Sequence, residues 1–167
     1  MAFQFTNEMR RVVAEQVLAY VATVCSDNTP NLSAQGTLGV YDDSHLIFAD
    51  LKSPQTIANL RFNPSIEINV VDPFVRRGFR FKGRAEVYSA GATFDRLRRF
   101  YSGIWLDAGR KPPVDDIRNI VMVTVERALP MVAPAYQRGE DELEIATEWE
   151  RYYHSLVSKR RTTFVEQ

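Results

Sequence analysis

The chain has 167 residues, with 21 basic and 21 acidic side chains, and 45% of its residues are hydrophobic. This length suits one globular domain, and the balanced charge argues against a general nucleic-acid-binding protein, which usually carries a basic excess. A single cysteine, Cys25, excludes an internal disulfide and is typical of a protein of the reducing cytoplasm. Because no apolar run reaches the length of a membrane span, we expect a cytoplasmic protein with no membrane partner.

The hydrophobic pattern changes between helical and strand periodicity along the chain. Apolar residues at helical spacing predict a first helix over 7–18, behind a cap at Thr6 or Asn7. Six segments have strand character and are bounded by turn residues: 20–26, 31–41, 45–50, 65–72, 78–89 and 119–132. Further helices are predicted over 53–63 and 93–105, with a loop over 107–116. This order predicts a mainly β fold with flanking helices, built as a closed antiparallel barrel.

The segment after the third predicted strand has the signals of a helix start. Ser53 can act as the N-cap, and Pro54 suits the first turn. The free N–H groups and the positive dipole end of such a helix would form an anion site beside Ser53 and Thr56. The alternative interpretation is an ordinary capped helix, since Ser-Pro helix starts are common and most serve only their own backbone.

A wider pattern surrounds this helix start. It comprises Pro-Asn-Leu-Ser at 30–33, a glycine, a turn at 42–44, a strand ending in Ala49-Asp50, and Thr-x-x-Asn-Leu-x-x-Asn-Pro over 56–64. In order and spacing this pattern resembles the FMN-binding split barrels, the pyridoxamine 5′-phosphate oxidase-like family, with a looser match from about Glu8 to Pro134. The resemblance implies a six-stranded antiparallel split β-barrel over 1–134 and a C-terminal helical tail over 135–167.

The same resemblance implies the position of an FMN site. In that family the phosphate and ribityl chain lie against a strand with a Ser-x-Lys-type pair and against the start of the following helix. Carried over to this chain, the contacts are Ser33, Gln35, Ser53, Gln55, Thr56 and Asn59, with the backbone of Ala49 and Asp50 near the isoalloxazine ring. Gln35 stands where a basic residue is often found, so phosphate affinity would depend on Lys52, Arg61 or a cationic strand.

The predicted strand over 78–89 has two chemically different faces. One face carries Phe81, Gly83 and Ala85, and the other carries Arg80, Lys82 and Arg84. One interpretation is a solvated edge strand whose cations discourage aggregation. The other, favoured by the resemblance, is a cationic wall beside the flavin, with Lys82 or Arg84 near its phosphate or pyrimidine end, where positive charge stabilises the reduced anionic ring.

The tail begins with an acidic cluster at 140–142 and ends with a basic one at 159–161. Acidic residues at the start and basic residues at the end suit the dipole of an exposed helix. The apolar side chains of the tail could also pack on a partner subunit. In the resembling family FMN sits at a dimer interface to which both chains contribute. The resemblance therefore implies a homodimer with two flavins.

The sequence gives no sign of hydrolytic or metal chemistry. His45 and His154 lie far apart with no triad arrangement around them, no Cys/His spacing suggests zinc, and no glycine-rich phosphate loop is present. This is compatible with flavin chemistry, in which the cofactor carries the reaction, and we assign no catalytic side chain.

The resemblance implies an FMN-dependent oxidoreductase that transfers hydride or electrons between a reductant such as NAD(P)H and a small-molecule acceptor. Nothing after Val132 matches the arginine- and histidine-bearing substrate motif of the authentic oxidase, so we expect a relative of that enzyme. Two alternatives stay open: a non-catalytic flavin-binding or sensing protein, and the same barrel holding deazaflavin F420 or haem.

Overall fold

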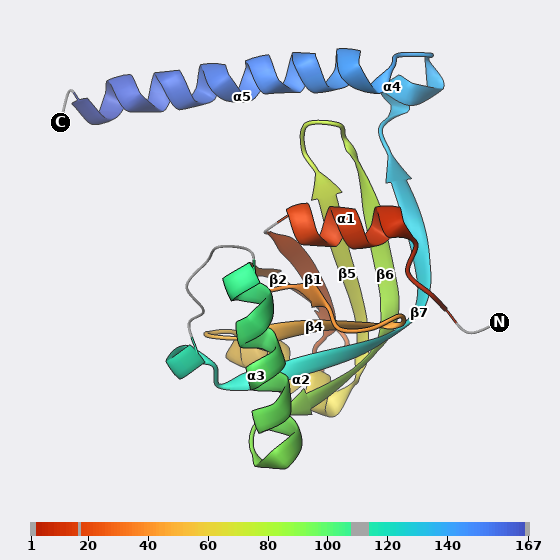
Figure 1. Ribbon diagram of the computed structural model, residues 1–167, viewed down its shortest axis with the longest axis vertical. Helices are drawn as coiled ribbons and strands as arrows, with labels where there is room; N and C mark the ends of the chain where they lie inside the picture. The colour runs from red at the N-terminus through yellow and green to blue at the C-terminus, as the bar shows by residue number, and fades with distance from the viewer. Residues whose placement is uncertain (1–2, 17, 108–113, 166–167) are drawn as a thin grey trace.

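The computed structural model describes residues 3–16, 18–107 and 114–165, and within these ranges the strands form one seven-stranded antiparallel sheet (Figure 1). In chain order the strands are β1 (Ala19–Val24), β2 (Pro30–Gln35), β3 (Gly39–Val40), β4 (His45–Asp50), β5 (Ser65–Asp72), β6 (Arg77–Tyr88) and β7 (Asn119–Val132). Across the sheet the order is β2-β1-β5-β6-β7-β4-β3. The predicted mainly β fold is confirmed.

The two edges of the sheet are consecutive in the chain. Residues 36–38 alone connect β2 to β3, although these strands lie at opposite edges. An extended chain spans at most about 3.5 Å per residue, so the sheet must curl until its edges approach each other, as in a split barrel. Six strands were predicted because the sequence over 31–41 has the pattern of one strand. In the structure this segment is divided into β2 and β3, because the chain leaves its pairing with β1 and begins a new one with β4.

The predicted helices form, with small differences at their ends. They are α1 (Asn7–Glu15), α2 (Pro54–Phe62) and α3 (Gly91–Asp107), and a 3₁₀ turn (Val114–Asp116) precedes β7. Thr6 caps α1 as predicted, because its Oγ1 accepts a hydrogen bond from the N–H of Met9 at 3.2 Å. In the tail, α4 (Pro134–Gln137) and α5 (Glu142–Val165) follow.

Two hydrophobic clusters hold the helices on the sheet. The inner cluster fills the curl of the sheet and contains, among others, Val13 from α1, Phe48, Leu60 from α2, and Phe81. The second cluster packs α3 against the other side of β4 and β7 and contains Ile47, Ala49, Phe94, Leu97, Tyr101, Ile117 and Ile120. β4 is therefore buried on both faces, since its residues alternate between the two clusters.

The alternation predicted for 78–89 is confirmed, but the edge-strand interpretation is wrong. β6 lies in the middle of the sheet, between β5 and β7. Its buried glycines mark close approaches of the neighbouring backbones: a Cβ on Gly78 would lie 2.1 Å from the carbonyl oxygen of Val70, and one on Gly83 would lie 2.0 Å from that of Thr124. The central strand thus needs glycine at both positions.

The C-terminal helix α5 lies over the turn between β5 and β6 (Figure 1). The guanidinium of Arg76 stacks over the ring of Trp149 at 4.1 Å, and Phe74 meets Tyr153 edge to face at 5.4 Å. Ile145 is buried, whereas Leu143 is exposed. Among the residues that the structure describes, no helix combines the length and apolar character needed to cross a membrane.

Candidate functional site

The start of α2 differs from a simple capped helix. Ser53 occupies the N-cap position, but its side chain makes no hydrogen bond to the helix, so the predicted side-chain cap is wrong. Its hydroxyl instead accepts a hydrogen bond from Nε2 of Gln35 at 2.9 Å, and its N–H donates to Oδ1 of Asp50 at 2.6 Å. The first turn of α2 is therefore held from outside, by β2 and by the end of β4.

Four of the predicted side chains meet at this helix start: Ser33, Gln35, Ser53 and Thr56. We call them the polar cluster. Ser33 Oγ accepts hydrogen bonds from Thr56 Oγ1 at 2.9 Å and from Gln35 Nε2 at 3.3 Å. Gln35 and Thr56 are 4% and 1% exposed. Because strand residues two apart share a face, β2 presents Ser33 and Gln35 together toward α2.

Asn59 and Gln55 extend the polar cluster along α2. Asn59 is buried; its Nδ2 donates to Thr23 Oγ1 at 2.9 Å, and its Oδ1 accepts from Gln55 Nε2 at 2.8 Å. The Asn59 amide also contacts Cys25 Sγ at 3.4 Å. We predicted Cys25 as core filler within a strand, whereas it lies in the turn after β1 and is half-buried. Thr23, which bonds Asn59, was not among the site residues predicted from the sequence.

The structure separates Ala49 from Asp50. Ala49 lies in the core under α3, and Thr37 Oγ1 donates to its carbonyl oxygen at 2.8 Å. Asp50 faces the other way and is 2% exposed. Its carboxylate accepts hydrogen bonds from the Ser53 N–H and from Asn119 Nδ2, the latter at 2.7 Å. Asp50 therefore adjoins the helix start, but Ala49 does not join the polar cluster.

Lys82 and Arg84 lie on the opposite face of the sheet from the polar cluster. The register places Ser33, Val21, Ile68 and Phe81 in one row on the inner face, so the residue after Phe81 points outward. Lys82 Nζ pairs with Glu67 Oε2 at 2.9 Å on that outer face. Within one chain, neither cation reaches the polar cluster.

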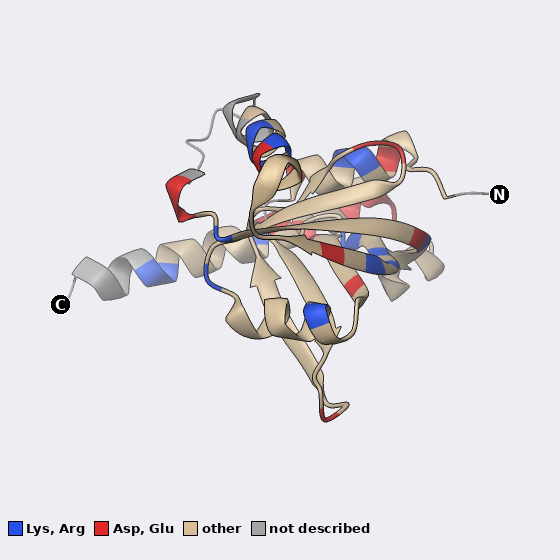
Figure 2. Cartoon of the chain, turned by 90° about the horizontal axis from the view of Figure 1, so that it is seen from below, with Lys and Arg blue, Asp and Glu red and all other residues tan. Residues whose placement is uncertain are grey.

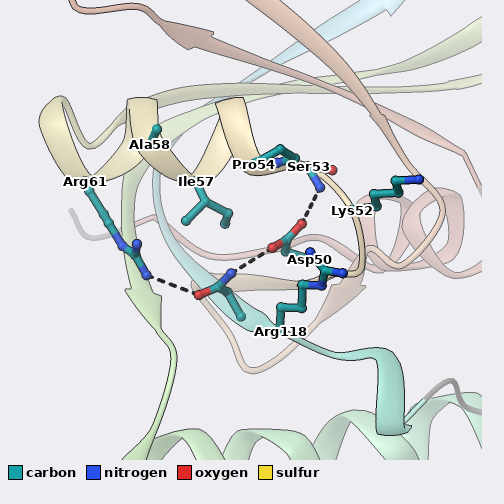
Figure 3. A pocket seen from close by; sticks show the side chains of 9 residues that line it. Asp50, Lys52, Ser53, Pro54, Ile57, Ala58, Arg61 and Arg118 are labelled. Atoms are coloured by element: carbon teal, nitrogen blue, oxygen red, sulfur yellow. Dashed lines mark hydrogen bonds between the residues drawn. The ribbon is translucent and has the colours of Figure 1, made fainter.

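The other side of the α2 start lines a pocket of about 220 Å³, which we call the cationic pocket (Figure 3). Its lining residues are Asp50, Lys52, Ser53, Pro54, Ile57, Ala58, Arg61, Arg118 and Asn119. Figure 3 shows Arg61 reaching down from the helix while Arg118 approaches from the strand side. Sequence reasoning missed Arg118 and Asn119, because only the pairing of Asp50 with Asn119 brings the start of β7 to this helix.

The outer face of β2, β1, β5 and β6 is hollowed and partly apolar. A hollow of about 480 Å³ is lined by Tyr20, Ala22, Leu32, Glu67, Asn69 and Arg80. A neighbouring hollow of about 410 Å³ includes Lys82. Leu32 is 67% exposed and Tyr20 is 47% exposed. Asn69 Oδ1 is buried without a hydrogen-bond partner among the described residues.

The structure gives no support for a catalytic triad at His45. Ser44 Oγ and the Asp42 carboxylate both contact Nδ1 of His45, so the ring cannot relay a proton between them through two nitrogens. Partial burial would raise the pKa of Asp42, but hydrogen bonds from Ser44 and His45 bring it below its usual value. Within the described part of the chain, no group of three or more His, Cys, Asp or Glu residues could hold a metal ion.

Comparisons with known proteins agree with this fold. The crystal structure of HupZ from Group A Streptococcus is 29% identical, with a TM-score of 0.63, over 75% of this chain and 93% of that one. An FMN-binding protein from Syntrophomonas wolfei is 17% identical, with a TM-score of 0.59 over 75% of this chain and 86% of that one. A structure described as an F420 reductase is 20% identical, with a TM-score of 0.57 over 75% of this chain and 98% of that one.

No curated protein sequence matches the chain significantly. The family model described as pyridoxamine 5′-phosphate oxidase, however, matches residues 5–131, which cover α1, α2, α3 and the whole sheet except the last residue of β7. The chain therefore belongs to the pyridoxamine 5′-phosphate oxidase-like family of FMN-binding split-barrel proteins.

Proposed function

We propose that this chain binds FMN and uses it to transfer hydride or electrons between a reductant such as NAD(P)H and a small-molecule acceptor in the cytoplasm. The observation that carries the proposal is the polar cluster. Three hydroxyls and one amide converge on a helix start whose N-cap side chain leaves the first turn uncapped. Membership of a flavin-binding family supports the same function.

The groups at the helix start fit a phosphate. The Thr56 hydroxyl and the Gln35 amide now donate to the hydroxyls of Ser33 and Ser53, and each can turn its hydrogen toward a phosphate oxygen instead. The α2 dipole adds a favourable positive potential. FMN, when bound, supplies a ring that accepts hydride or electrons; the chain's own residues bind the phosphate, orient the cofactor and exclude water from it.

We further infer a homodimer with the cofactor at its interface. Lys82 and Arg84 cannot reach the polar cluster of their own chain. Both point to the outer face, where Lys82 lines the hollow that neighbours the one lined by exposed Leu32 and Tyr20. Covering this face with a second copy would bury the apolar side chains and bring the cations to a cofactor shared by both chains. The backbone of Ala49 and Asp50 remains a proposed contact near the isoalloxazine ring.

The first test is an absorption titration of the full chain with FMN. The wild-type protein is expected to retain FMN after removal of excess flavin, and Thr56→Val is expected to weaken binding about 10- to 100-fold, because a charge-assisted hydrogen bond is lost. Thr147→Val is a matched control, since the hydrogen bond that the structure describes for its hydroxyl, to the Leu143 carbonyl, lies within α5. A Thr56→Val protein with a lowered melting temperature and unchanged FMN affinity would identify Thr56 as purely structural.

Turnover distinguishes an enzyme from a binding protein. NAD(P)H oxidation by the FMN-loaded protein above the rate of free flavin supports the oxidoreductase. Flavin retention without turnover across several reductants supports a sensing or carrier role. A protein that rejects FMN but retains F420 would favour the deazaflavin alternative, for which the likeness to an F420 reductase is the specific observation; the same titration with haem tests the remaining alternative.

The interface can be tested with one exposed side chain. Leu32→Glu is expected to convert a dimer into a monomer in light scattering and to reduce FMN retention, because a charge would be buried in the interface. Leu143→Glu makes the same chemical change on exposed α5 and is expected to leave the dimer intact. Monomers from Leu143→Glu with dimers from Leu32→Glu would place the interface on α5 and contradict the proposal.

A further inference from the structure

The cationic pocket lies on a different side of α2 from the polar cluster. Thr56 and Asn59 point toward β1 and β2, where they bond Ser33 and Thr23. Ile57 and Arg61 line the pocket on another face of the same helix. We propose that this pocket is a second anion site, which binds a phosphate or carboxylate group of a small molecule independently of the polar cluster.

The charge balance of the pocket favours an anionic group. Lys52, Arg61 and Arg118 line it, and Asp50 is its sole acidic residue. Both carboxylate oxygens of Asp50 are already bonded, to the Ser53 N–H and to Asn119. Within the described ranges, neither Lys52 nor Arg118 forms an ion pair, whereas Arg10, Arg77, Arg80 and Lys82 each have a carboxylate partner. The pocket therefore keeps a net positive charge that a bound anion would compensate.

Arg61 is held in place before any ligand arrives. Its Nη2 donates to Ser89 Oγ at 2.7 Å and to Asn119 Oδ1 at 3.2 Å. Ser89 Oγ in turn donates to the same Asn119 oxygen at 2.6 Å, and Asn119 is fixed from its other side by Asp50. Both contacts use one nitrogen of the guanidinium, so its other N–H groups remain able to bind a carboxylate or phosphate. Such fixed donors lower the entropy cost of binding.

The size of the pocket limits the ligand. Its volume of about 220 Å³ is below the roughly 300–1,000 Å³ of pockets that enclose a whole ligand. The site therefore suits one anionic group and not a flavin ring. That group can come from free phosphate or from a phosphate or carboxylate on the reactant that meets the flavin.

Amide chemical shifts under titration with inorganic phosphate, at constant ionic strength, test the site in the full chain with and without saturating FMN. Shifts are expected at Lys52, Arg118 and Asn119 in both conditions. Arg118→Gln is expected to weaken this binding at least fivefold and to leave the fold intact, because no hydrogen bond of its side chain is found among the described residues. Arg61→Gln is a second variant of the pocket and tests the same binding. Arg99→Gln, on an exposed position of α3, is the control and should change the phosphate affinity by less than twofold.

The outcomes separate this site from the flavin site. Saturable shifts at the pocket in a protein that does not bind FMN would support the anion site while refuting the flavin proposal. Shifts confined to Ser33, Gln35 and their neighbours, and abolished by FMN, would overturn the anion site. So would equal weakening by Arg118→Gln and Arg99→Gln, which would show that net charge alone governs binding. Repeating the titration with malonate and with a phosphate monoester identifies the source: tighter binding than phosphate indicates a reactant group.

Discussion

A Gly83→Ala variant is expected to lose about 3 kcal/mol or more of unfolding free energy, because backbone overlap is harder to relieve than side-chain crowding. The added Cβ would lie 2.0 Å from the carbonyl oxygen of Thr124 and 3.1 Å from the Cα of Val125. Gly83 also sits at the irregularity in the pairing of β6 with β7, in the middle of the sheet. Urea unfolding measured by circular dichroism gives the change directly.

Gly103→Ala is the matched control for this variant. Gly103 lies in α3, and a Cβ there meets nothing within 4 Å. Alanine is the better helix former, so this change is expected to stabilise the protein by up to about 1 kcal/mol. If Gly83→Ala unfolded at the same urea concentration as the wild-type protein, β6 and β7 would have to lie farther apart than described.

Asp50→Ala is expected to destabilise the protein by about 3 kcal/mol, because two half-buried donors lose a buried, charged acceptor. Those donors are the Ser53 N–H, at 2.6 Å, and Asn119 Nδ2, at 2.7 Å. The same change frees the start of α2 and releases Asn119 from its position beside Arg61. We therefore expect weaker FMN retention as well as a lower urea midpoint.

Asp43→Ala provides the comparison for Asp50. The carboxylate of Asp43 forms an ion pair with Arg10 at 2.6 Å, and the Asp43 side chain is exposed to solvent. Exposed ion pairs contribute little, so this variant is expected to lose less than about 1 kcal/mol. Comparable losses from the two variants would show that the part-buried hydrogen bonds of Asp50 are no more important than a surface ion pair.

Sequence reasoning succeeded where the signal was local. The position of α2 follows from Ser53 and Pro54, and the two faces of β6 follow from strict alternation. The order of the motifs around 30–64 was enough to identify the family. The family resemblance led us to consider Ser33, Gln35 and Thr56 together, and in the structure Ser33 bonds both Gln35 and Thr56.

The remaining features depend on pairing between distant segments. Arg118 and Asn119 reach the start of α2 only because β7 pairs with β4, and no local pattern encodes that pairing. Lys82 is cationic by sequence, but the register of β1, β5 and β6 decides which side of the sheet it faces. The interruption between β2 and β3 is a requirement of barrel closure, which a continuous run of strand-forming residues does not reveal.

The short link between β2 and β3 couples places that are far apart in the sheet. Thr37, in the middle of this link, bonds the Ala49 carbonyl, and its own carbonyl accepts the Tyr101 hydroxyl. Separation of β2 from β1 therefore strains the pairing of β3 with β4 and the contact with α3. We expect β2, β3 and the α3 contact to open as one cooperative unit. A ligand that tightens Ser33 and Gln35 will slow amide exchange in β3 and at the α3 contact, although it touches neither.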